Sequence, residues 1–385
     1  MSLKYSTLIA ATLLLGGCTT AEVQRSINLA RGATNFQNMS TAQQVRFIAS
    51  QDATLSQYVD IEKLFQKKLA EFIADATREW GDQPKQASRK KYVKYTQHYK
   101  SRAEVDFETR TVTVETVDSA TPLKSLKEAI TTTLLTPFDP TQVDLHSASE
   151  VKLGGEPFLY KQVLDHEGQP IRWRWRAERY ADELMGNKLQ EKRINGKRVR
   201  YVTFDLQPVS LHAQAEAYRA DVLRHSKRYG ISPALVYAVI EVESSFNPYA
   251  LSSAPAYGLM QIVPKTAGRD TWKFLHGNDR VPTATYLYNP GNNIEMGTAY
   301  LHIIDTRYLA EIAHPLSREY CTIAAYNTGS GNVLKSFHSS DRSKAVDLIN
   351  TMQPEAVYDK LRRDLPYDET RRYVYKVREA KRHYL

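Results

Sequence analysis

The spacing of apolar residues changes near Gln207-Pro208, and this change limits the chain to two parts of different structural class. Upstream, stretches of alternating apolar and polar residues are mixed with stretches of helical spacing, which predicts an α+β fold. Downstream, helical spacing continues to the C-terminus, and no β-like stretch of any length interrupts it. We therefore expect a small α+β domain over residues 91–208, followed by an all-α domain over residues 209–385.

Turn-forming and helix-starting residues divide the α+β part into elements. Alternation on both sides of Thr109-Arg110 predicts a hairpin, and His166–Gln169 has the composition of a second hairpin turn. Thr121-Pro122 has the residue types of an N-cap and a first helical position. The elements expected after the first hairpin are a helix from Thr121-Pro122, a hairpin of Phe158–Leu164 with Ile171–Arg176, a helix near Arg179–Lys192 and a strand at Arg200–Leu206.

The segment Arg172–Arg176 alternates three arginines with two tryptophans. In a strand, this period of two would place Trp173 and Trp175 on one face and the arginines on the other. We expect both tryptophans to lie in the core and the arginines to be solvated. The alternative is an aromatic platform that binds a sugar or a base.

The all-α part contains several amphipathic segments with recognisable ends. Gly230 has the position of a helix C-cap, and Ser232-Pro233 would begin the next helix. The expected helices are His212–Tyr229, one from Ser232-Pro233, Asn293–Tyr308, Arg318–Tyr326, Asp341–Met352, Glu355–Arg363 and Asp368–Tyr384.

Residues 18–90 are polar and helix-prone, and they show no clear core of their own. Apolar spacing from Gln57 to Ala76 predicts one amphipathic helix, which the run Gly81–Pro84 would end. The basic run Lys85–Lys94 is interpreted as a solvated linker. This part of the mature chain is expected to connect a membrane anchor to the folded domains.

The first seventeen residues have the features of a secretory signal. Lys4 precedes the short apolar run Leu8–Leu15, which is too short to span a bilayer as a helix. The following Gly16-Gly17-Cys18 resembles a bacterial lipobox, in which the cysteine is acylated and becomes the first mature residue. An ordinary signal peptide with an incidental cysteine is the alternative. By resemblance to bacterial sorting signals, Thr19 favours an outer-membrane anchor that faces the periplasm.

Cysteine count and charge exclude several classes of protein. If Cys18 carries lipid, Cys321 has no partner for a disulfide, and its apolar surroundings indicate a buried, inert thiol. Residues 209–385 carry 22 basic and 18 acidic side chains, and residues 18–208 carry 29 and 25, so neither part is strongly basic. We therefore expect no nucleic-acid partner, and the scattered histidines predict neither a metal site nor a cofactor.

Glu243 is the main candidate for acid–base chemistry. It lies near the end of the helix expected from Ser232-Pro233, and Val236, Val239 and Ile240 share its face. A carboxyl on an apolar face resists ionisation, so its pKa should rise into the range that a general acid needs. A buried structural glutamate paired with an arginine or with backbone N–H groups is the alternative.

Four motifs in order carry a family resemblance. They are Glu243–Ser252 with Gly258–Gln261, Asn289–Leu301, Ala325–Gly329 and Glu369–Val374. Together they resemble the soluble lytic transglycosylase domain, a relative of goose-type lysozyme. With a lipobox-like start and an α+β region before it, the whole arrangement resembles the membrane-bound lytic transglycosylases. Pro255 and Thr328 depart from the family pattern and leave the local shape of the cleft open.

The resemblance implies an all-α, lysozyme-like catalytic domain that cleaves the MurNAc–GlcNAc bond of peptidoglycan without water and forms 1,6-anhydroMurNAc. Glu243 would act first as the acid and then as the base. Carried over by motif, the substrate-binding residues would be Ser252, Met260, Gln261, Tyr326, Asn327 and Tyr373. Ser252 would bond near the N-acetyl group or the acid, and Met260 and Gln261 would line the sugar subsites. Tyr326 and Asn327 would position the scissile region, and the Tyr373 hydroxyl would bond toward Glu243.

Two alternatives remain open. A hydrolytic muramidase would need a second acid to hold water, and Asp270 and Glu295 are the sequence candidates. A catalytically silent, wall-binding lipoprotein would use the same fold without chemistry. Peptidoglycan strands and outer-membrane lipid are the expected partners, and the sequence names no cell-wall synthesis or division protein.

Overall fold

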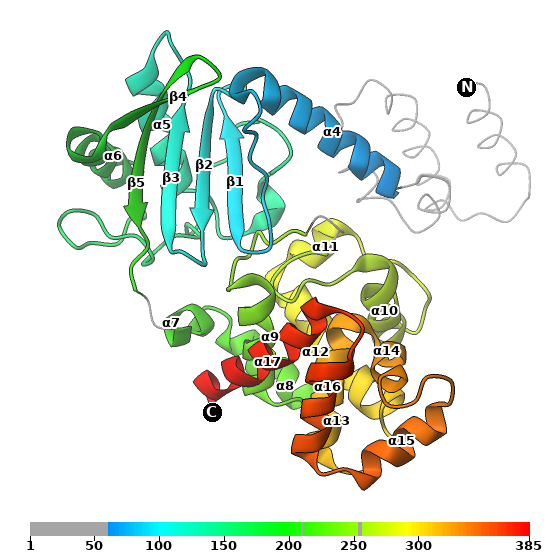
Figure 1. Cartoon of the computed structure of the whole chain (residues 1–385). Helices are drawn as coiled ribbons and strands as arrows, with labels where there is room; N and C mark the ends of the chain where they lie inside the picture. The colour runs from blue at the N-terminus through cyan, green and yellow to red at the C-terminus, as the bar shows by residue number, and fades with distance from the viewer. Residues whose placement is uncertain (1–60, 209–210, 253–255) are drawn as a thin grey trace, which may run out of the picture. The chain divides into compact units, whose positions relative to one another are not determined.

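The computed structural model describes residues 61–208, 211–252 and 256–385 (Figure 1). Residues 79–385 form one compact unit. Helix α4 covers Ile61–Trp80 and ends at Gly81, whose φ of +62° is left-handed, so the expected stop is confirmed. The signal peptide, Cys18 and Thr19 lie outside the described residues. No helix in the described ranges is long and apolar enough to cross a membrane.

Five antiparallel strands form the sheet of the α+β part, in the order β1-β2-β3-β5-β4 (Figure 1). Its strands are β1 (Lys91–Thr96), β2 (Ser101–Asp106), β3 (Thr111–Thr116), β4 (Gln190–Ile194) and β5 (Lys197–Asp205). Strands β2 and β3 confirm the hairpin expected around Thr109-Arg110, with Asp106 opposite Thr111. Strand β5 confirms the strand expected near residue 200, whereas β1 and β4 were not predicted.

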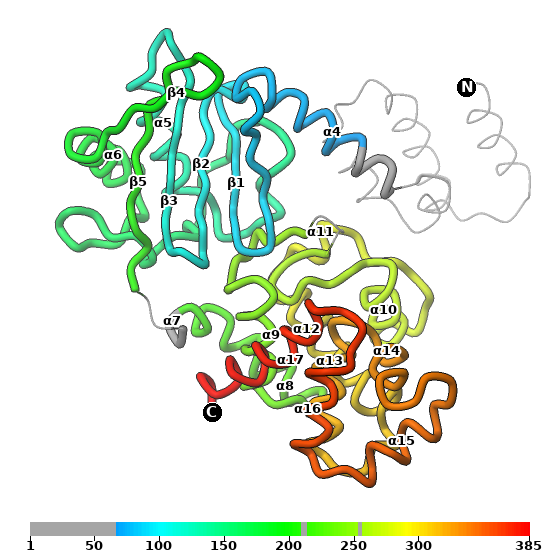
Figure 2. The backbone as a smooth tube through the Cα atoms, viewed as in Figure 1, coloured from blue at the N-terminus to red at the C-terminus, as the bar shows by residue number. Residues whose placement is uncertain are grey.

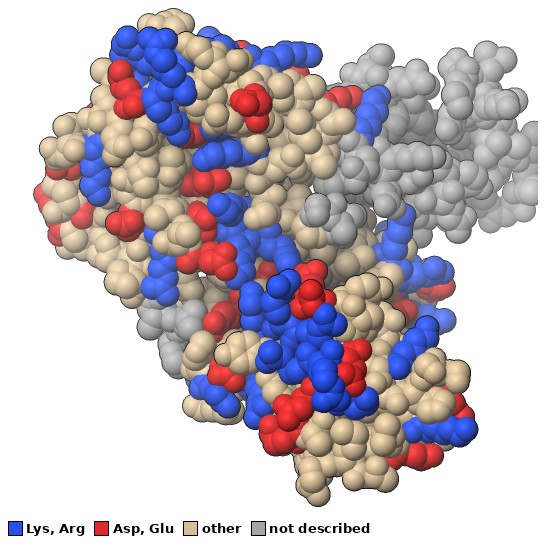
Figure 3. Space-filling model, viewed as in Figure 1, with Lys and Arg blue, Asp and Glu red and all other residues tan. Residues whose placement is uncertain are grey.

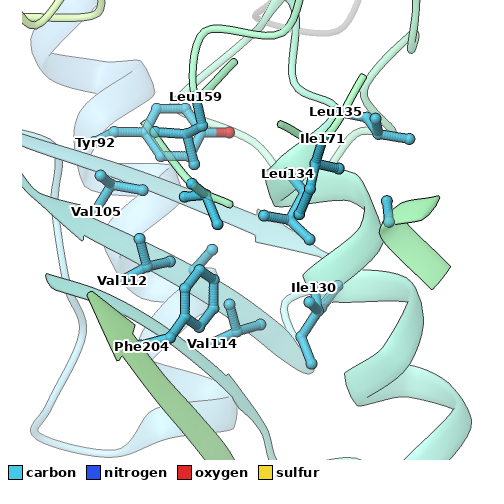
Figure 4. Packing of buried hydrophobic residues seen from close by; sticks show 14 of the residues in the cluster. Tyr92, Val105, Val112, Val114, Ile130, Leu134, Leu135, Leu159, Ile171 and Phe204 are labelled. Atoms are coloured by element: carbon cyan, nitrogen blue, oxygen red, sulfur yellow. The ribbon is translucent and has the colours of Figure 1, made fainter. Parts of the chain in front are cut away.

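Helices α5 (Pro122–Leu134) and α6 (Arg174–Lys188) pack against each other and against the sheet. The start of α5 at Pro122 confirms the Thr121-Pro122 signal. Figure 4 shows how Ile130 and Leu134 of α5 face Val112, Val114 and Phe204 of the sheet. Alternation along the strands and helical spacing along α5 thus supply the two sides of one apolar core.

The second expected hairpin is wrong. Only an isolated bridge, Leu164 with Pro170, joins the two segments, and α6 already begins at Arg174. Arg174 lies one helical turn before Glu178, and its Nε donates to that carboxylate over 2.7 Å, a pairing that a helix allows and a strand does not. Trp173 and Trp175 are 60% and 55% exposed, so the expectation that they lie in the core is also wrong.

The basic run Lys85–Lys94 is not a solvated linker. Its second half forms β1, where Lys94 is buried and its Nζ donates to the Ser147 carbonyl over 2.7 Å. Lysine stems are apolar, so a strand can bury them if the ammonium group finds an acceptor. The alternation that predicts strands is absent because β1 is buried on both faces.

The remainder of the described chain is helical (Figure 2). Its α-helices are α7 (Leu211–Glu216), α8 (Arg219–Tyr229), α9 (Pro233–Ser244), α10 (Arg269–His276), α11 (Ala284–Tyr288), α12 (Pro290–Ile303), α13 (Pro315–Thr328), α14 (Ser330–Lys335), α15 (Arg342–Thr351), α16 (Pro354–Asp364) and α17 (Asp368–Lys381). The single helix expected over His212–Tyr229 is two helices, α7 and α8. Gly230 ends α8 in the left-handed conformation, as expected.

Helix α9 lies at the centre of this part, packed against α8 and α17, and α13 packs against α16 and α17. Cys321 is a fully buried free thiol of α13, and burial raises its pKa, which confirms the expected inert residue.

The loop after α9 joins the helical part to the α+β core. Tyr249 is fully buried, and its ring centroid lies 5.1 Å from that of Tyr92 and 5.3 Å from that of Phe158. Its hydroxyl donates to the Pro137 carbonyl. The residues just after α9 are therefore held by a core that belongs to the α+β fold.

A buried ion pair in the sheet gives a stability prediction. The Arg102 Nε lies 2.6 Å from the Glu115 Oε2, and both side chains are almost fully buried. Arg102 also lies 3.7 Å over the Trp80 ring. Glu115→Ala would leave a buried charge unpaired, so we expect a loss of about 3–5 kcal/mol in unfolding free energy, measured by denaturant unfolding.

The matched control is Glu191→Ala, which removes a half-exposed partner of Arg200 in the same sheet. Its loss should be much smaller, because exposed ion pairs contribute little to stability. Equal losses for the two variants would contradict the structural importance of the buried pair.

Candidate active site

A cavity of about 650 Å³ opens beside the last turn of α9. Its walls come from segments far apart in the sequence: the turn before β1, α9, the loop after α9, α13, α14 and the start of α17. The lining residues are Arg89, Glu243, Ser252, Ala256, Gln261, Val263, Tyr326, Asn327, Thr328, Asn332, Tyr367, Glu369 and Thr370. The fold thus brings together Glu243 and four of the six residues predicted to bind substrate.

Glu243 reaches the cavity because α9 is apolar and ends just after it. Most of α9 is buried, and Ser245 leaves the helix with a φ of +50°. The Glu243 residue is only 5% exposed. Burial raises its pKa to about 7, although Arg89 and the Tyr373 hydroxyl lower it in part. The sequence prediction of a raised pKa on an apolar helix face is confirmed.

Arg89 is the cation of this site. Its Nη1 lies 3.4 Å from the Glu243 Oε2, and its Nη2 lies 3.1 Å from the Glu369 Oε1. Glu243 is therefore both the candidate acid and a glutamate that is paired with an arginine. Sequence reasoning missed both Arg89 and Glu369. Glu369 is the first residue of the family motif Glu369–Val374, whereas nothing near Arg89 in the sequence points to Glu243.

Ser252 and Gln261 present polar groups to the cavity from the loop after α9. The Ser252 hydroxyl accepts a hydrogen bond from the Ala256 N–H over 3.2 Å. The Gln261 Nε2 donates to the Gly258 carbonyl over 2.9 Å. The Gln261 Oε1 is buried and has no hydrogen-bond partner among the described residues. Pro255 lies outside the described residues.

Met260 does not line the cavity, which corrects its expected place along the sugar subsites. It is fully buried, and its side chain fills the space over Gly297, where an added Cβ would lie 2.3 Å from its sulfur. Met260 instead acts through its backbone: its N–H donates to the Asn293 Oδ1, and its carbonyl accepts from the Tyr326 hydroxyl, each over 2.8 Å.

Asn327 and Tyr373 occupy neighbouring positions on α13 and α17. The Asn327 Oδ1 accepts from the Thr370 hydroxyl over 2.7 Å, which holds the amide at the cavity wall. Tyr373 is buried behind this wall, and its pKa is raised by burial and by the charge of Glu243. Its hydroxyl acts on the Glu243 carboxyl and lowers the pKa of that group in part, in the expected direction, although no hydrogen bond of normal geometry joins it to another described residue.

The two acids predicted for a muramidase lie elsewhere. Asp270 accepts from the Tyr308 hydroxyl over 3.0 Å, and Glu295 pairs with Arg228 over 2.7 Å. Neither lines the cavity, whose acidic residues within the described ranges are Glu243 and Glu369. No cluster of His, Cys, Asp and Glu among the described residues could hold a metal ion.

Comparison with known families matches two domains to the chain. The domain described as "Membrane-bound lytic murein transglycosylase C, N-terminal domain" matches residues 58–217, and the transglycosylase SLT domain matches residues 222–349. The chain is 45% identical over 299 residues to membrane-bound lytic murein transglycosylase C of Yersinia pestis (strain Pestoides F). The aligned region covers 77% of this chain and 83% of that protein. The protein of that name from Yersinia pseudotuberculosis serotype O:1b (strain IP 31758) gives the same values.

Among solved structures, the 70 kDa soluble lytic transglycosylase SLT70 of Escherichia coli is 26% identical to this chain. The superposition covers 45% of this chain and 25% of that one, with a TM-score of 0.34.

The raised pKa of Glu243 predicts a pH-dependent stability. An ordinary carboxyl titrates near 4.5 and this one near 7, so the folded state binds more protons between these pH values. Stability should therefore fall by about 3 kcal/mol as the pH rises through this window. Glu243→Gln removes this loss. The melting temperature of the variant minus that of the parent should therefore be about 5 °C larger at pH 8 than at pH 4.5.

Calorimetry at the two pH values checks this, with Glu216→Gln, an exposed carboxyl of α7, as the control that should show no such difference. The same pH dependence in the parent and in Glu243→Gln would rule out the raised pKa.

Proposed function

The chain belongs to the family of membrane-bound lytic murein transglycosylase C, and on this premise we propose how the cavity around Glu243 cleaves peptidoglycan. The substrate bond is the β-1,4 link between MurNAc and GlcNAc. The observation that carries the proposal is a carboxyl with a pKa of about 7, buried at the wall of a large cavity. Such a group can give up a proton and take one back near neutral pH.

The reaction needs one carboxyl used twice. The protonated Glu243 would give its proton to the glycosidic oxygen as the bond from that oxygen to C1 of MurNAc breaks. The carboxylate would then take the proton of the MurNAc 6-hydroxyl as this oxygen bonds to the same C1. The products are a free 4-hydroxyl on the leaving sugar and a 1,6-anhydroMurNAc end, and no water is consumed.

The neighbouring groups support binding and positioning. Ser252, Gln261 and Asn327 would bind the sugars, because their polar groups line the cavity. Tyr326 would hold the loop of Met260 and Gln261 through its bond to the Met260 carbonyl. Tyr373, buried against Glu243, would lower the proton affinity of the carboxyl and so help the base step.

The hydrolytic alternative is less well supported. A muramidase needs a second carboxyl that holds water, and Glu369 is the remaining acid at the cavity. Its side chain is 63% exposed, and its carboxylate is already paired with Arg89. A silent wall-binding protein would have no need for a buried carboxyl of raised pKa.

The remaining proposals concern location and organisation. We propose a signal peptide over residues 1–17, a lipid anchor at Cys18 in the outer membrane with a segment to residue 90, and the α+β and catalytic domains over residues 91–208 and 209–385. Figure 3 shows lysine and arginine side chains gathered over the face where α16 and α17 lie. Basic residues there suit a polymer that carries carboxylates, as peptidoglycan does.

Digestion of purified peptidoglycan tests the reaction. The full-length protein in detergent should release fragments lighter by one water than hydrolysis products, as read by mass spectrometry. Glu243→Gln should reduce the rate by at least about 1,000-fold, because it removes both proton transfers. Reducing ends of full mass would instead establish a muramidase, and binding without products would support the wall-binding protein.

Fractionation tests the anchor. Cys18→Ala should move the protein from the membrane fraction to the soluble periplasmic fraction, because it removes the acylated residue. The activity on isolated peptidoglycan should be unchanged. Continued membrane fractionation of this variant would rule out lipid as the main anchor.

A further inference from the structure

Arg89 enters the active site from the α+β fold, 154 positions before Glu243 in the chain. Hydrogen bonds hold the backbone on both sides of it. The Ser88 N–H donates to the Lys91 carbonyl over 2.9 Å, and the Lys90 carbonyl accepts from the Phe107 N–H over 3.0 Å. Arg89 therefore lies in a turn that the sheet itself fixes in place.

The same turn is fastened to the chain that carries Glu243. Asn247 follows Glu243 by four positions and is fully buried, and its Nδ2 donates to the Arg89 carbonyl over 3.2 Å. The anchoring of Tyr249 in the α+β core fixes the same loop. Packing and hydrogen bonds thus fix the backbone positions of Arg89 and Glu243 relative to each other.

The guanidinium divides its donors between two carboxylates of different exposure. Glu243 is 6% exposed at its side chain, whereas Glu369 is 63% exposed. The other titratable groups placed around Glu243 are the hydroxyls of Tyr326 and Tyr373, which are neutral because burial raises their pKa values. Within the described residues, Arg89 and Glu369 are therefore the charged groups that act on Glu243.

We propose that Arg89 is a positioning residue of this active site, supplied by the α+β domain to balance Glu243 between its acid and base states, with Glu369 setting the strength of that contact. This inference rests on the proposed function, in which a single carboxyl serves twice. Burial alone would keep the proton on Glu243 and disfavour the base step. Arg89 opposes burial, and Glu369 weakens Arg89 by competing for the guanidinium.

The proposal predicts shifts of opposite sign. The free enzyme needs a protonated Glu243, so kcat/KM should fall as the pH rises through the pKa of this group. Arg89→Met keeps the aliphatic stem and removes the charge, and should move this alkaline limb up by about 1 pH unit. Glu369→Gln should move it down by a smaller amount. In the Arg89→Met background, Glu369→Gln should move the alkaline limb by less than it does in the parent.

Two controls separate this role from a structural one. Lys90→Met removes the adjacent cation, whose Nζ pairs with Glu108 over 2.9 Å and does not line the cavity. It should leave the pH profile unchanged. Arg89→Lys keeps the charge, so its alkaline limb should lie between that of the parent and that of Arg89→Met. Melting temperatures of all variants show whether each one is folded.

A direct titration keeps the test independent of activity. In the full-length protein labelled with carboxyl ¹³C-glutamate, the Glu243 signal is the one lost in Glu243→Gln, and its pKa should rise in Arg89→Met and fall in Glu369→Gln. If the parent forms no anhydro products, the proposed function fails, yet this titration still tests Arg89. An unchanged Glu243 titration in Arg89→Met, or an equal shift in Lys90→Met, would overturn the proposal.

Discussion

The loop that follows α9 is the constraint on which the active site depends. Ser245 and Phe246 take left-handed conformations, with φ of +50° and +59°, so the chain leaves the helix abruptly after Glu243. Tyr249 then enters the core of the α+β fold, where Tyr92 and Phe158 enclose its ring. The few residues between Glu243 and Tyr249 thus connect the end of α9 to the core of the α+β fold.

This arrangement explains why Glu243 can be buried and still be useful. Burial raises its pKa, and the guanidinium of Arg89 at 3.4 Å partly offsets the effect. Either influence alone would hold the carboxyl in one protonation state. Their opposition leaves the pKa at about 7, where both states are accessible at neutral pH.

A second set of contacts holds the Met260–Gln261 segment beside the cavity through backbone groups. The Met260 N–H and carbonyl bond to Asn293 and Tyr326, and Gly258 passes close to the Asn293 amide with a φ of +74°. A side chain at Gly258 would meet that amide at 2.5 Å, so the approach requires glycine. Several residues of the family motifs therefore shape the cavity from behind it, whereas Gln261 lines it.

The sequence by itself determined the features that depend on neighbours in the chain. The β2–β3 hairpin, the start of α5, the end of α8, the start of α9 and the apolar face around Glu243 all follow from local spacing and from cap or turn residues. Local patterns could not decide which surfaces meet. The tertiary structure placed Trp173 and Trp175 in solvent, Met260 behind the cavity and Arg89 within it. Periodicity reports that a side chain is apolar or charged, whereas its partner is chosen by packing between segments that lie far apart in the sequence.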